Sequence, residues 1–215
     1  MRYDLHAHTL ISDGELLPAE LAARAMVSGH SAVAITDHVD MTNIDSAIGQ
    51  ALRAAELVED YIRVIPGVEI THVPPSKING LVERARRLGA EIVVVHGETL
   101  VEPVAAGTNR MAVQNPEVDI LAHPGAISPA DVEAAAANNV ALEITGRKGH
   151  SLANGHVARL AASLGAEMLV NSDAHAPGDL MDADRAGAVA LGAGMDERLA
   201  HRALEAFPAE LVRRL

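Results

Sequence analysis

The sequence contains no cysteine and no tryptophan, and its only aromatic side chains are one phenylalanine and two tyrosines. Without cysteine there is no disulfide and no thiolate nucleophile, and a reducing compartment is compatible with the chain. So few rings offer little surface on which the bases of a single-stranded nucleic acid could stack. No apolar run approaches the roughly 20 residues that a membrane helix needs, and the first strand begins without an apolar leader. We therefore expect a cytoplasmic protein with no membrane partner.

Positive charge is also scarce, since 17 Lys and Arg stand against 29 Asp and Glu and give a formal net charge of -12. Such a chain repels polyanions at long range, so we expect no long nucleic acid as a partner. Bound divalent cations would reverse the sign of the charge locally, so that a small phosphorylated substrate could still be attracted. The length of 215 residues and a hydrophobic content of 49% suit one domain, which we expect to span residues 1–215.

Short apolar strands alternate with helical patterns along the chain. The predicted strands are the opening segment and residues 32–35, 62–65, 91–95, 118–122, 140–144 and 167–170. The predicted helices cover about 18–29, 46–60, 75–88, 129–138, 153–164, 180–191 and 196–215, with a short helix after 107–110. This alternation predicts an all-parallel sheet, and the near-continuous apolar strands indicate that both faces are covered.

Polar residues fall at or just after the carboxyl end of the predicted strands. They are His6 and His8, Asp37 and His38, Glu69, His96, His123, Glu143 with Arg147, and Asp173 with His175. In an open doubly wound sheet only the loops at the switch point converge, whereas in a closed barrel all the strand ends surround one mouth. We therefore predict an α/β fold, a distorted (β/α)7 TIM-like barrel of parallel strands with a metal site at the C-terminal rim.

The metal site is suggested by the types of side chain that share this rim. In an extended strand His6 and His8 point to the same face, and Asp13 lies in a turn-like sequence that can fold back over them. Any one histidine could be a hydrogen-bonded strand end, but the combined set favours metal binding. It comprises nine candidate ligands: His6, His8, Asp13, His38, Glu69, His96, His123, Asp173 and His175.

Nine groups exceed the four ligands that one zinc ion takes, and they suit two or three ions. A mostly imidazole set with a few carboxylates favours zinc, manganese or iron over calcium. Ions held roughly 3.5 to 4 Å apart lower the pKa of a bridging water and stabilise both oxygens of a phosphoryl displacement. The reaction indicated is hydrolysis by a metal-bridging hydroxide.

The motifs also resemble those of a known family. Its pattern is seen in Asp4-Leu5-His6-Ala7-His8 with Ser12-Asp13-Gly14, Ile35-Thr36-Asp37-His38, Gly67-Val68-Glu69, the strand-end His96, His123-Pro124 and Ser172-Asp173-Ala174-His175. In this order they are similar to the PHP (polymerase and histidinol phosphatase) family, and most similar to its small stand-alone histidinol-phosphatase-like members. The resemblance implies a distorted (β/α)7 barrel, two or three zinc, manganese or iron ions, and phosphoesterase activity.

The resemblance also implies how the ligands are shared among the ions. One ion would be held by His6, His8, Glu69 and Asp173, a second by Glu69, His96 and His123, and a third by Asp13, His38 and His175. Glu69 would then bridge two ions.

Phosphate recognition is predicted for Arg147, because a guanidinium can grip phosphate oxygens through two parallel hydrogen bonds. Lys148 and Arg110 are second choices. The alternative for Arg147 is a salt bridge to Glu143 or Asp173.

Other polar residues receive secondary roles. Asp37 is expected to orient an imidazole rather than to bind metal. We expect His30 and His201 to be solvated. Three further histidines lie in loops near the predicted mouth and are candidates for contacting the substrate or protonating the leaving group: His72, His150 and His156.

Together these features predict a metal-dependent phosphoesterase that hydrolyses a small phosphate ester, with Glu69, Asp173 and Arg147 as its catalytic residues. Similar ions could serve an amidohydrolase-like hydrolase of C–N or C–O bonds, which is the first alternative. The second alternative is a non-catalytic scaffold similar to the PHP-like subunits of RNase P. A scaffold would predict eroded ligands and a basic surface, and the sequence shows neither.

Overall fold

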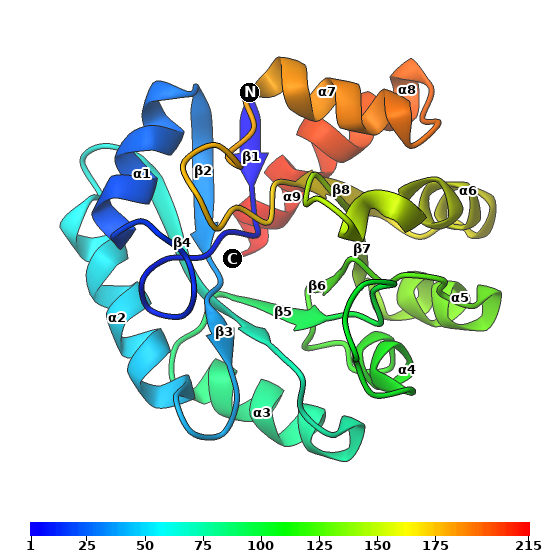
Figure 1. The fold of residues 1–215 in the computed structure, drawn as a ribbon, viewed down its shortest axis with the longest axis horizontal. Helices are drawn as coiled ribbons and strands as arrows, with labels where there is room; N and C mark the ends of the chain where they lie inside the picture. Colours follow the sequence, from blue (N-terminus) through cyan, green and yellow to red (C-terminus); the bar gives the residue numbers. More distant parts are fainter.

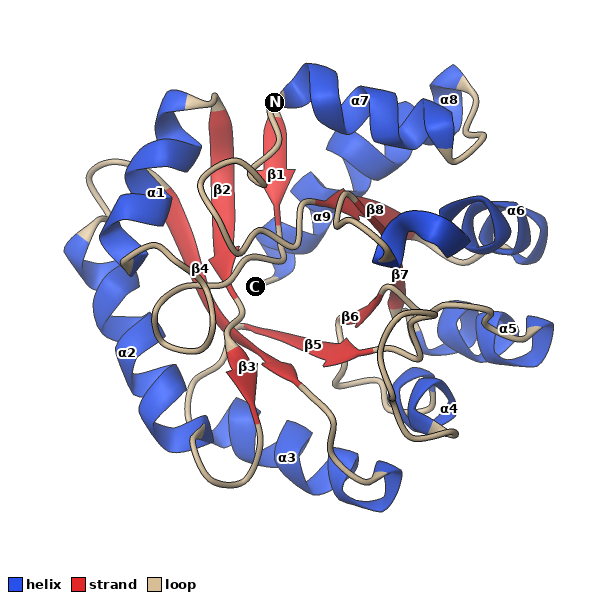
Figure 2. Cartoon of the chain, viewed as in Figure 1, coloured by secondary structure: helices blue, strands red, loops and turns tan.

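Parallel strands form a ring at the centre of the molecule, and helices surround it (Figures 1 and 2). The computed structural model describes residues 1–215. Seven strands follow one another around the ring: β1 (Arg2–Asp4), β2 (His30–Ile35), β4 (Arg63–Ile70), β5 (Ile92–His96), β6 (Ile120–Ala122), β7 (Ala141–Thr145) and β8 (Met168–Asn171). Each neighbouring pair is parallel. A short eighth strand, β3 (His38–Val39), continues the position of β2 alongside β4.

The ring is nearly closed where the beginning of the chain meets β8. Ala7 forms an isolated parallel bridge with Ala174. The amide of His8 donates to the carbonyl of Ala174 at 2.8 Å, and the amide of Asp173 donates to the carbonyl of His6 at 3.1 Å. The predicted distorted barrel of seven parallel strands is therefore confirmed.

Helices connect the strands on the outside. They are α1 (Pro18–Val27), α2 (Ile44–Leu57), α3 (Pro75–Arg87), α4 (Thr108–Val113), α5 (Pro129–Asn138), α6 (Asn154–Leu164), α7 (Ala183–Gly192), α8 (Glu197–His201) and α9 (Phe207–Arg214). Four of them have proline in the first turn, where its fixed φ and missing N–H suit a helix start. A cluster of 38 buried apolar residues joins the helices to the outer face of the strands. None of the helices is long and apolar enough to cross a membrane.

Alternation along β5 shows how a strand delivers its last residue to the mouth. Val93 and Val95 belong to the outer cluster, whereas Ile92 and Val94 belong to a separate cluster inside the ring. Successive side chains of a strand point to opposite faces, so the next inward residue is His96.

The same alternation operates in two other strands. In β4 it leads inward from Ile65 through Gly67 to Glu69, and beyond β8 it leads from Leu169 to Asp173. Gly67 is required by close packing, because a Cβ atom there would lie 2.3 Å from Cγ2 of Ile92.

The opposite end of the ring is filled by the C-terminal helix. Phe207 and Leu211 of α9 belong to the interior cluster together with Leu5, Ile92 and Leu169. Figure 1 shows the chain ending near the centre of the ring, where α9 lies against the strands. The interior near the amino ends of the strands is therefore lined by apolar side chains, whereas the predicted ligands lie at the other end.

The predicted single helix over 196–215 is interrupted. Residues Arg202–Ala206 form a π-helical turn between α8 and α9. The guanidinium of Arg202 pairs with Glu167 at 2.5 Å and with Glu210 at 2.6 Å. Its Cζ atom also lies 5.5 Å from the centre of the Phe207 ring. The π turn, with its extra residue, therefore begins at the arginine that makes these ion pairs. The spacing of apolar residues in the sequence does not predict either feature.

Replacing Phe207 with alanine is expected to lower the free energy of unfolding by about 3–5 kcal/mol, because it leaves a cavity in the interior cluster. Urea denaturation measures the change. Leu57→Ala is the control, since Leu57 is 73% exposed. The control should change stability by no more than about 0.5 kcal/mol. Equal midpoints for the two variants would show that α9 is not part of the core.

Candidate metal centre

The structure brings all nine predicted ligands together at the mouth of the ring. Their donor atoms form overlapping groups in which every atom lies within 4.8 Å of the others. The groups are His8, Asp13, His38 and His175; His6, His123 and Asp173; His6, His8 and Glu69; and Glu69, His96 and His123. Residues separated by more than 160 positions in the sequence thus share one cluster.

The first two histidines face each other inside this cluster. The Nε2 atoms of His6 and His8 lie 3.1 Å apart, and both rings are buried. Nδ1 of His6 donates to the carboxylate of Glu143 at 2.7 Å, so the lone pair of its Nε2 faces His8. Two nitrogen atoms at this distance need a proton or a cation between them.

Three other imidazoles are held in the same orientation. Nδ1 of His96 donates to the carbonyl of the next residue at 3.1 Å, and Nδ1 of His175 donates to the carbonyl two residues before it at 3.0 Å. Nδ1 of His38 lies 2.7 Å from the hydroxyl of Thr71, which gives its own hydrogen to the carbonyl of Glu69. In the neutral form of each ring, with its hydrogen on Nδ1, the Nε2 lone pair is available to a metal ion.

Glu69 is the most informative member of the cluster. Its side chain is 0% exposed, and neither carboxylate oxygen accepts a hydrogen bond. Nδ1 of His38 lies 2.8 Å from Oε2 and 2.7 Å from the hydroxyl of Thr71. Burial opposes a charge on this ring, but the carboxylates of Glu69 and Asp13 raise the pKa of His38 to about 9. The nearest remaining groups are Nε2 of His6 at 3.4 Å and the Nε2 atoms of His8 and His123 at 3.6 Å. A buried carboxylate without donors is costly unless a positive charge accompanies it.

The spacing of the atoms also fits metal ions. Two ligands each about 2.0–2.1 Å from a tetrahedral zinc ion lie about 3.4 Å apart. Asp173 has Nε2 of His8 3.2 Å from Oδ1 and Nε2 of His123 3.6 Å from Oδ2. Nδ1 of both His8 and His123 is buried without a hydrogen-bond partner. Donor types and distances therefore fit the predicted ions.

The buried imidazoles of the cluster differ in the direction of their pKa shifts. Burial and the neighbouring imidazole of His38 hold the pKa of His8 well below its usual range, which favours the neutral form that binds metal. Burial likewise lowers the pKa of His123. Burial also opposes the charge on His6, but the carboxylates of Glu143 and Glu69 raise its pKa well above the usual range. The carboxylates thus demand positive charge at this point, which a divalent ion would also supply.

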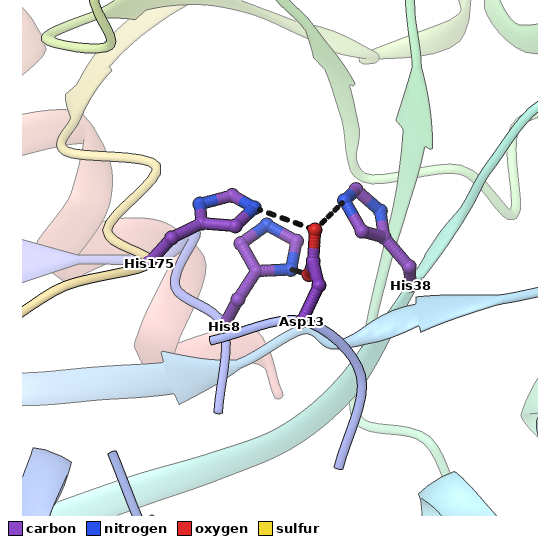
Figure 3. A group of neighbouring side chains, drawn as sticks. All are labelled: His8, Asp13, His38 and His175. Carbon is purple, nitrogen blue, oxygen red and sulfur yellow. Dashed lines mark ion pairs between the residues drawn. The ribbon is translucent and has the colours of Figure 1, made fainter. Parts of the chain in front are cut away.

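The outer group is more accessible, and Figure 3 shows Asp13 between three imidazole rings. Oδ2 of Asp13 lies 3.4 Å from Nε2 of His175 and 3.6 Å from Nε2 of His38, and Oδ1 lies 3.9 Å from Nδ1 of His8. The Asp13 side chain is 55% exposed. Partial burial opposes its charge, but the imidazoles of His175 and His38 lower its pKa to about 2. This carboxylate is therefore ionised at neutral pH.

The loop that carries Asp13 is fixed by Asp37, so the expectation that Asp37 orients an imidazole is wrong. Its carboxylate accepts hydrogen bonds from the amides and hydroxyls of Thr9 and Ser12, at 2.7 to 3.0 Å. Gly14 ends the same loop, and a Cβ atom there would lie 2.6 Å from the carbonyl group of His8. The four hydrogen bonds to Asp37 and the close packing at Gly14 thus hold the loop so that Asp13 lies beside the cluster.

Sequence reasoning missed the positioning roles of two residues behind the cluster. Glu143 accepts hydrogen bonds from the ring of His6, from the amide of His123 at 3.0 Å and from the side chain of Asn171 at 2.9 Å. Asn171 in turn accepts from the amide of Leu5 at 2.9 Å. The alternation along β7 could have predicted this role, because Glu143 follows Ala141 on the inward face of the strand. The prediction instead considered Glu143 only as a partner of Arg147.

Two candidate ligands adopt backbone angles that are uncommon for residues other than glycine. The φ angle is 28° at His123 and 52° at Asp173. Such angles cost energy and persist where the surrounding structure enforces them, as at binding and catalytic sites. The amide of His123 donates to Glu143, and that of Asp173 donates to the carbonyl of His6. These hydrogen bonds hold the two residues at their φ angles.

The predicted phosphate-binding residues are not grouped together. Arg147 lies at the rim with its side chain 31% exposed, and it pairs with Asp179 at 3.3 Å rather than with Glu143 or Asp173. Lys148 is exposed. Arg110 pairs with Asp131 of α5, which occupies its guanidinium. Arg147 is therefore the cation best placed to reach a ligand.

Two other histidines have contrasting surroundings. His201 is exposed, as expected. The expectation that His30 is solvated is wrong, because its ring is buried and Nδ1 lies 3.0 Å from the carbonyl of Ala25. His30 is part of the fold rather than of the surface.

A polar pocket of about 410 Å³ opens beside the outer group. Only one of its nine lining residues is hydrophobic, and none is a lysine or arginine. The lining is Asp13, His38, Val39, Asp40, Thr42, Asn43, Thr71, His72 and Glu102. A small polar molecule could therefore reach the exposed edge of the cluster.

Comparison with known proteins identifies the family. The model of the PHP domain matches residues 4–99. Uncharacterized protein MJ1295 of Methanocaldococcus jannaschii is 48% identical over 218 residues, and the match covers 100% of both chains. The chain belongs to the PHP family. Ribonuclease P protein component 3 of Methanosarcina barkeri is 30% identical over 147 residues, which cover 66% of this PHP chain and 55% of that protein.

Solved structures share the PHP fold at low sequence identity. Histidinol phosphate phosphatase of Lactococcus lactis, complexed with zinc, L-histidinol and phosphate, gives a TM-score of 0.64 at 17% identity, covering 91% of this chain and 94% of that one. A chain of archaeal ribonuclease P with mature tRNA gives a TM-score of 0.69 at 16% identity, covering 99% of this chain and 89% of that one. A chain from the crystal structures of YwqE from Bacillus subtilis and CpsB from Streptococcus pneumoniae, described as metal-dependent tyrosine phosphatases, gives a TM-score of 0.65 at 17% identity, covering 98% of this chain and 94% of that one.

Glu143→Gln should lower the free energy of unfolding of the PHP chain by about 1–3 kcal/mol. The glutamine NH2 group would face the groups that donate to Glu143, and a donor cannot accept their hydrogen bonds. Denaturation in the presence of chelator measures this change without a contribution from bound ions. Glu133→Gln is the matched control, since Glu133 is exposed on α5. If both variants unfold at the parent midpoint, Glu143 does not support the cluster.

Proposed function

We propose that this PHP protein is a metal-dependent phosphoesterase that hydrolyses a small phosphate ester, using two or three divalent ions of zinc, manganese or iron. The observation that carries the proposal is Glu69, a buried carboxylate that is surrounded by imidazole nitrogens at 2.8 to 3.6 Å. His6, His8, Glu69 and Asp173 would hold one ion.

The remaining ligands would hold the other ions. Glu69 would bridge to a second ion with His96 and His123, and Asp13, His38 and His175 would hold the third. Bound there, the ions would activate a water molecule and stabilise the charge on the phosphoryl oxygens.

The protein contributes orientation and charge to this chemistry. Glu143 fixes the ring of His6 by accepting the hydrogen on Nδ1, and Asp37 fixes the loop that carries Asp13. Arg147 at the rim would exchange its contact with Asp179 for the phosphate oxygens of the substrate. Burial of the inner ligands excludes bulk water, which strengthens the electrostatic interactions there.

Known proteins with this fold support the choice of phosphate. The histidinol phosphate phosphatase structure contains zinc and phosphate, and the YwqE and CpsB proteins are metal-dependent phosphatases. Fold similarity at such identities does not transfer a substrate. The pocket beside the outer group contains Asp13, Asp40 and Glu102 and no lysine or arginine, so it favours a leaving group without a second phosphate.

Protein purified without chelator should contain at least two transition-metal ions per chain and release phosphate from small esters. Glu69→Gln or Asp173→Asn should reduce both metal content and phosphate release, the latter by at least about 100-fold, since even indirect partners of a ligand are worth 10–100-fold. Elemental analysis and a phosphate-release screen measure the two effects.

Arg147→Gln is the matched variant for the same experiment. It should keep the parent metal content and raise KM by about 10- to 100-fold, the equivalent of a lost charge-assisted hydrogen bond of about 1.5–3 kcal/mol. Amide and lactone substrates belong in the same screen. Turnover of these in preference to phosphate esters would favour the amidohydrolase alternative, and parent activity in Glu69→Gln would refute the assignment of its role.

A second candidate function is that of a ribonuclease P protein subunit, because component 3 of Methanosarcina barkeri is similar over two thirds of this chain. The formal charge of -12 opposes it, since neutralising RNA phosphates requires lysine and arginine. A complete set of nine candidate ligands at the mouth also favours the enzyme.

Mobility-shift titration with tRNA distinguishes the two functions. We expect no shift at physiological salt up to a protein concentration of about 10 µM. That concentration lies within the range of dissociation constants for ordinary non-specific binding. Submicromolar binding that weakens steeply with added salt would establish an RNA-binding role instead.

A further inference from the structure

A second group of imidazoles surrounds Glu102, outside the nine candidate ligands. Glu102 lies in the loop between β5 and α4. Its Oε2 lies 3.1 Å from Nε2 of His72 and 3.1 Å from Nε2 of His96, and its Oε1 lies 3.3 Å from Nε2 of His150. These histidines are the only polar side chains in contact with the carboxylate.

The group extends from the solvent into the buried cluster. The side chains of His72 and Glu102 are 40% and 38% exposed, whereas those of His150 and His96 are 8% and 2% exposed. His72 and Glu102 also line the polar pocket. The backbone at His72 has a φ of 52°, an angle that a residue with a Cβ rarely adopts unless the structure enforces it.

Donor types and spacing are those of a metal site. His72, His96 and Glu102 each offer one atom, and these atoms lie within 4.8 Å of one another. Separations of 3.1 Å are close to the distance of about 3.4 Å expected between two ligands of one tetrahedral zinc ion. Imidazole with carboxylate suits zinc and similar ions.

His96 belongs to this group and also to the buried group with Glu69 and His123. Its Nδ1 is engaged by the carbonyl of the next residue, so only one lone pair, on Nε2, is available. One imidazole nitrogen therefore serves one ion at a time. His96 can therefore bind an ion in the outer group or an ion in the inner group, but not both at once.

We propose that His72, Glu102 and His96 form an outer site for a divalent transition-metal ion, with His150 on the second carboxylate oxygen, that captures ions and passes them to Glu69 and His123. The inference rests on the proposed metal centre.

Burial makes such a step useful. Glu69 and His123 have side chains that are 0% and 1% exposed, so a hydrated ion cannot meet them directly. Glu102 can bind an ion while part of its water shell remains, and His96 is the ligand common to the outer and inner positions. Asp13 provides the equivalent exposed carboxylate for the group with His8 and His175. Each half of the centre thus has one acidic side chain open to solvent.

Zinc uptake by chelator-treated protein tests the proposal. The full chain is mixed with Zn²⁺ and a zinc-responsive dye, uptake is followed in time, and final zinc content is measured by elemental analysis after desalting. Glu102→Gln should slow the uptake by at least about tenfold, the lower end of the effect of losing a partner next to a metal ligand. Final zinc content should equal that of the parent. His72→Gln should show the same pattern.

Asp40→Asn is the matched control, because Asp40 is an exposed acid on the same pocket that bonds to Thr42 and contacts no histidine. It should take up zinc at the parent rate, and circular dichroism checks that all variants are folded. Parent-rate uptake in Glu102→Gln overturns the capture site. Reduced final content at an unchanged rate also overturns it, because Glu102 would then be a permanent ligand. Parent protein that takes up no zinc refutes the metal centre itself, and the capture site with it.

Discussion

The contact between the first residues of the chain and β8 is the constraint on which the candidate metal centre depends. Arg2 and Asp4 form a buried ion pair at 3.0 Å, and the carboxylate of Asp4 accepts the amide of Ser172 at 3.0 Å. Arg2 also donates to the carbonyl of Val170 at 2.9 Å. These buried charges are tolerated because each has partners of opposite sign or hydrogen-bonding groups. Without this contact, His6 would not lie near the carboxylate that follows β8.

Two buried carboxylates illustrate how the fold separates support from function. Glu143 and Glu69 are both 0% exposed. Glu143 accepts three hydrogen bonds from the protein, so its buried oxygens have partners and it can orient His6 and His123. Glu69 lies among imidazoles instead, and although burial opposes its charge, His6 and His38 lower its pKa well below the usual range. The first arrangement makes a rigid frame, and the second makes a site that is complete only with a cation.

Strand periodicity explains what could be predicted from the sequence. Inward positions of β5 are Ile92 and Val94, so the period of two places His96 at the mouth without any tertiary information. His123 departs from this rule, since it follows the inward Ala122 directly and is turned toward the cluster by a φ of 28°. Its place at a strand end was predictable, but its direction was not.

Loop residues show the corresponding limit. Asp37 and Glu102 lie outside the regular part of any strand, and their partners come from other segments. Asp37 binds Thr9 and Ser12, and Glu102 contacts three histidines. No periodicity encodes such contacts, because loop geometry is set by tertiary packing. The fold alone also leaves function open, since phosphatases and a ribonuclease P subunit share it. Glu69 favours the enzyme, because replacing a buried acid surrounded by imidazoles with a well-packed apolar side chain is often neutral or stabilising, so a scaffold would gain nothing by keeping it.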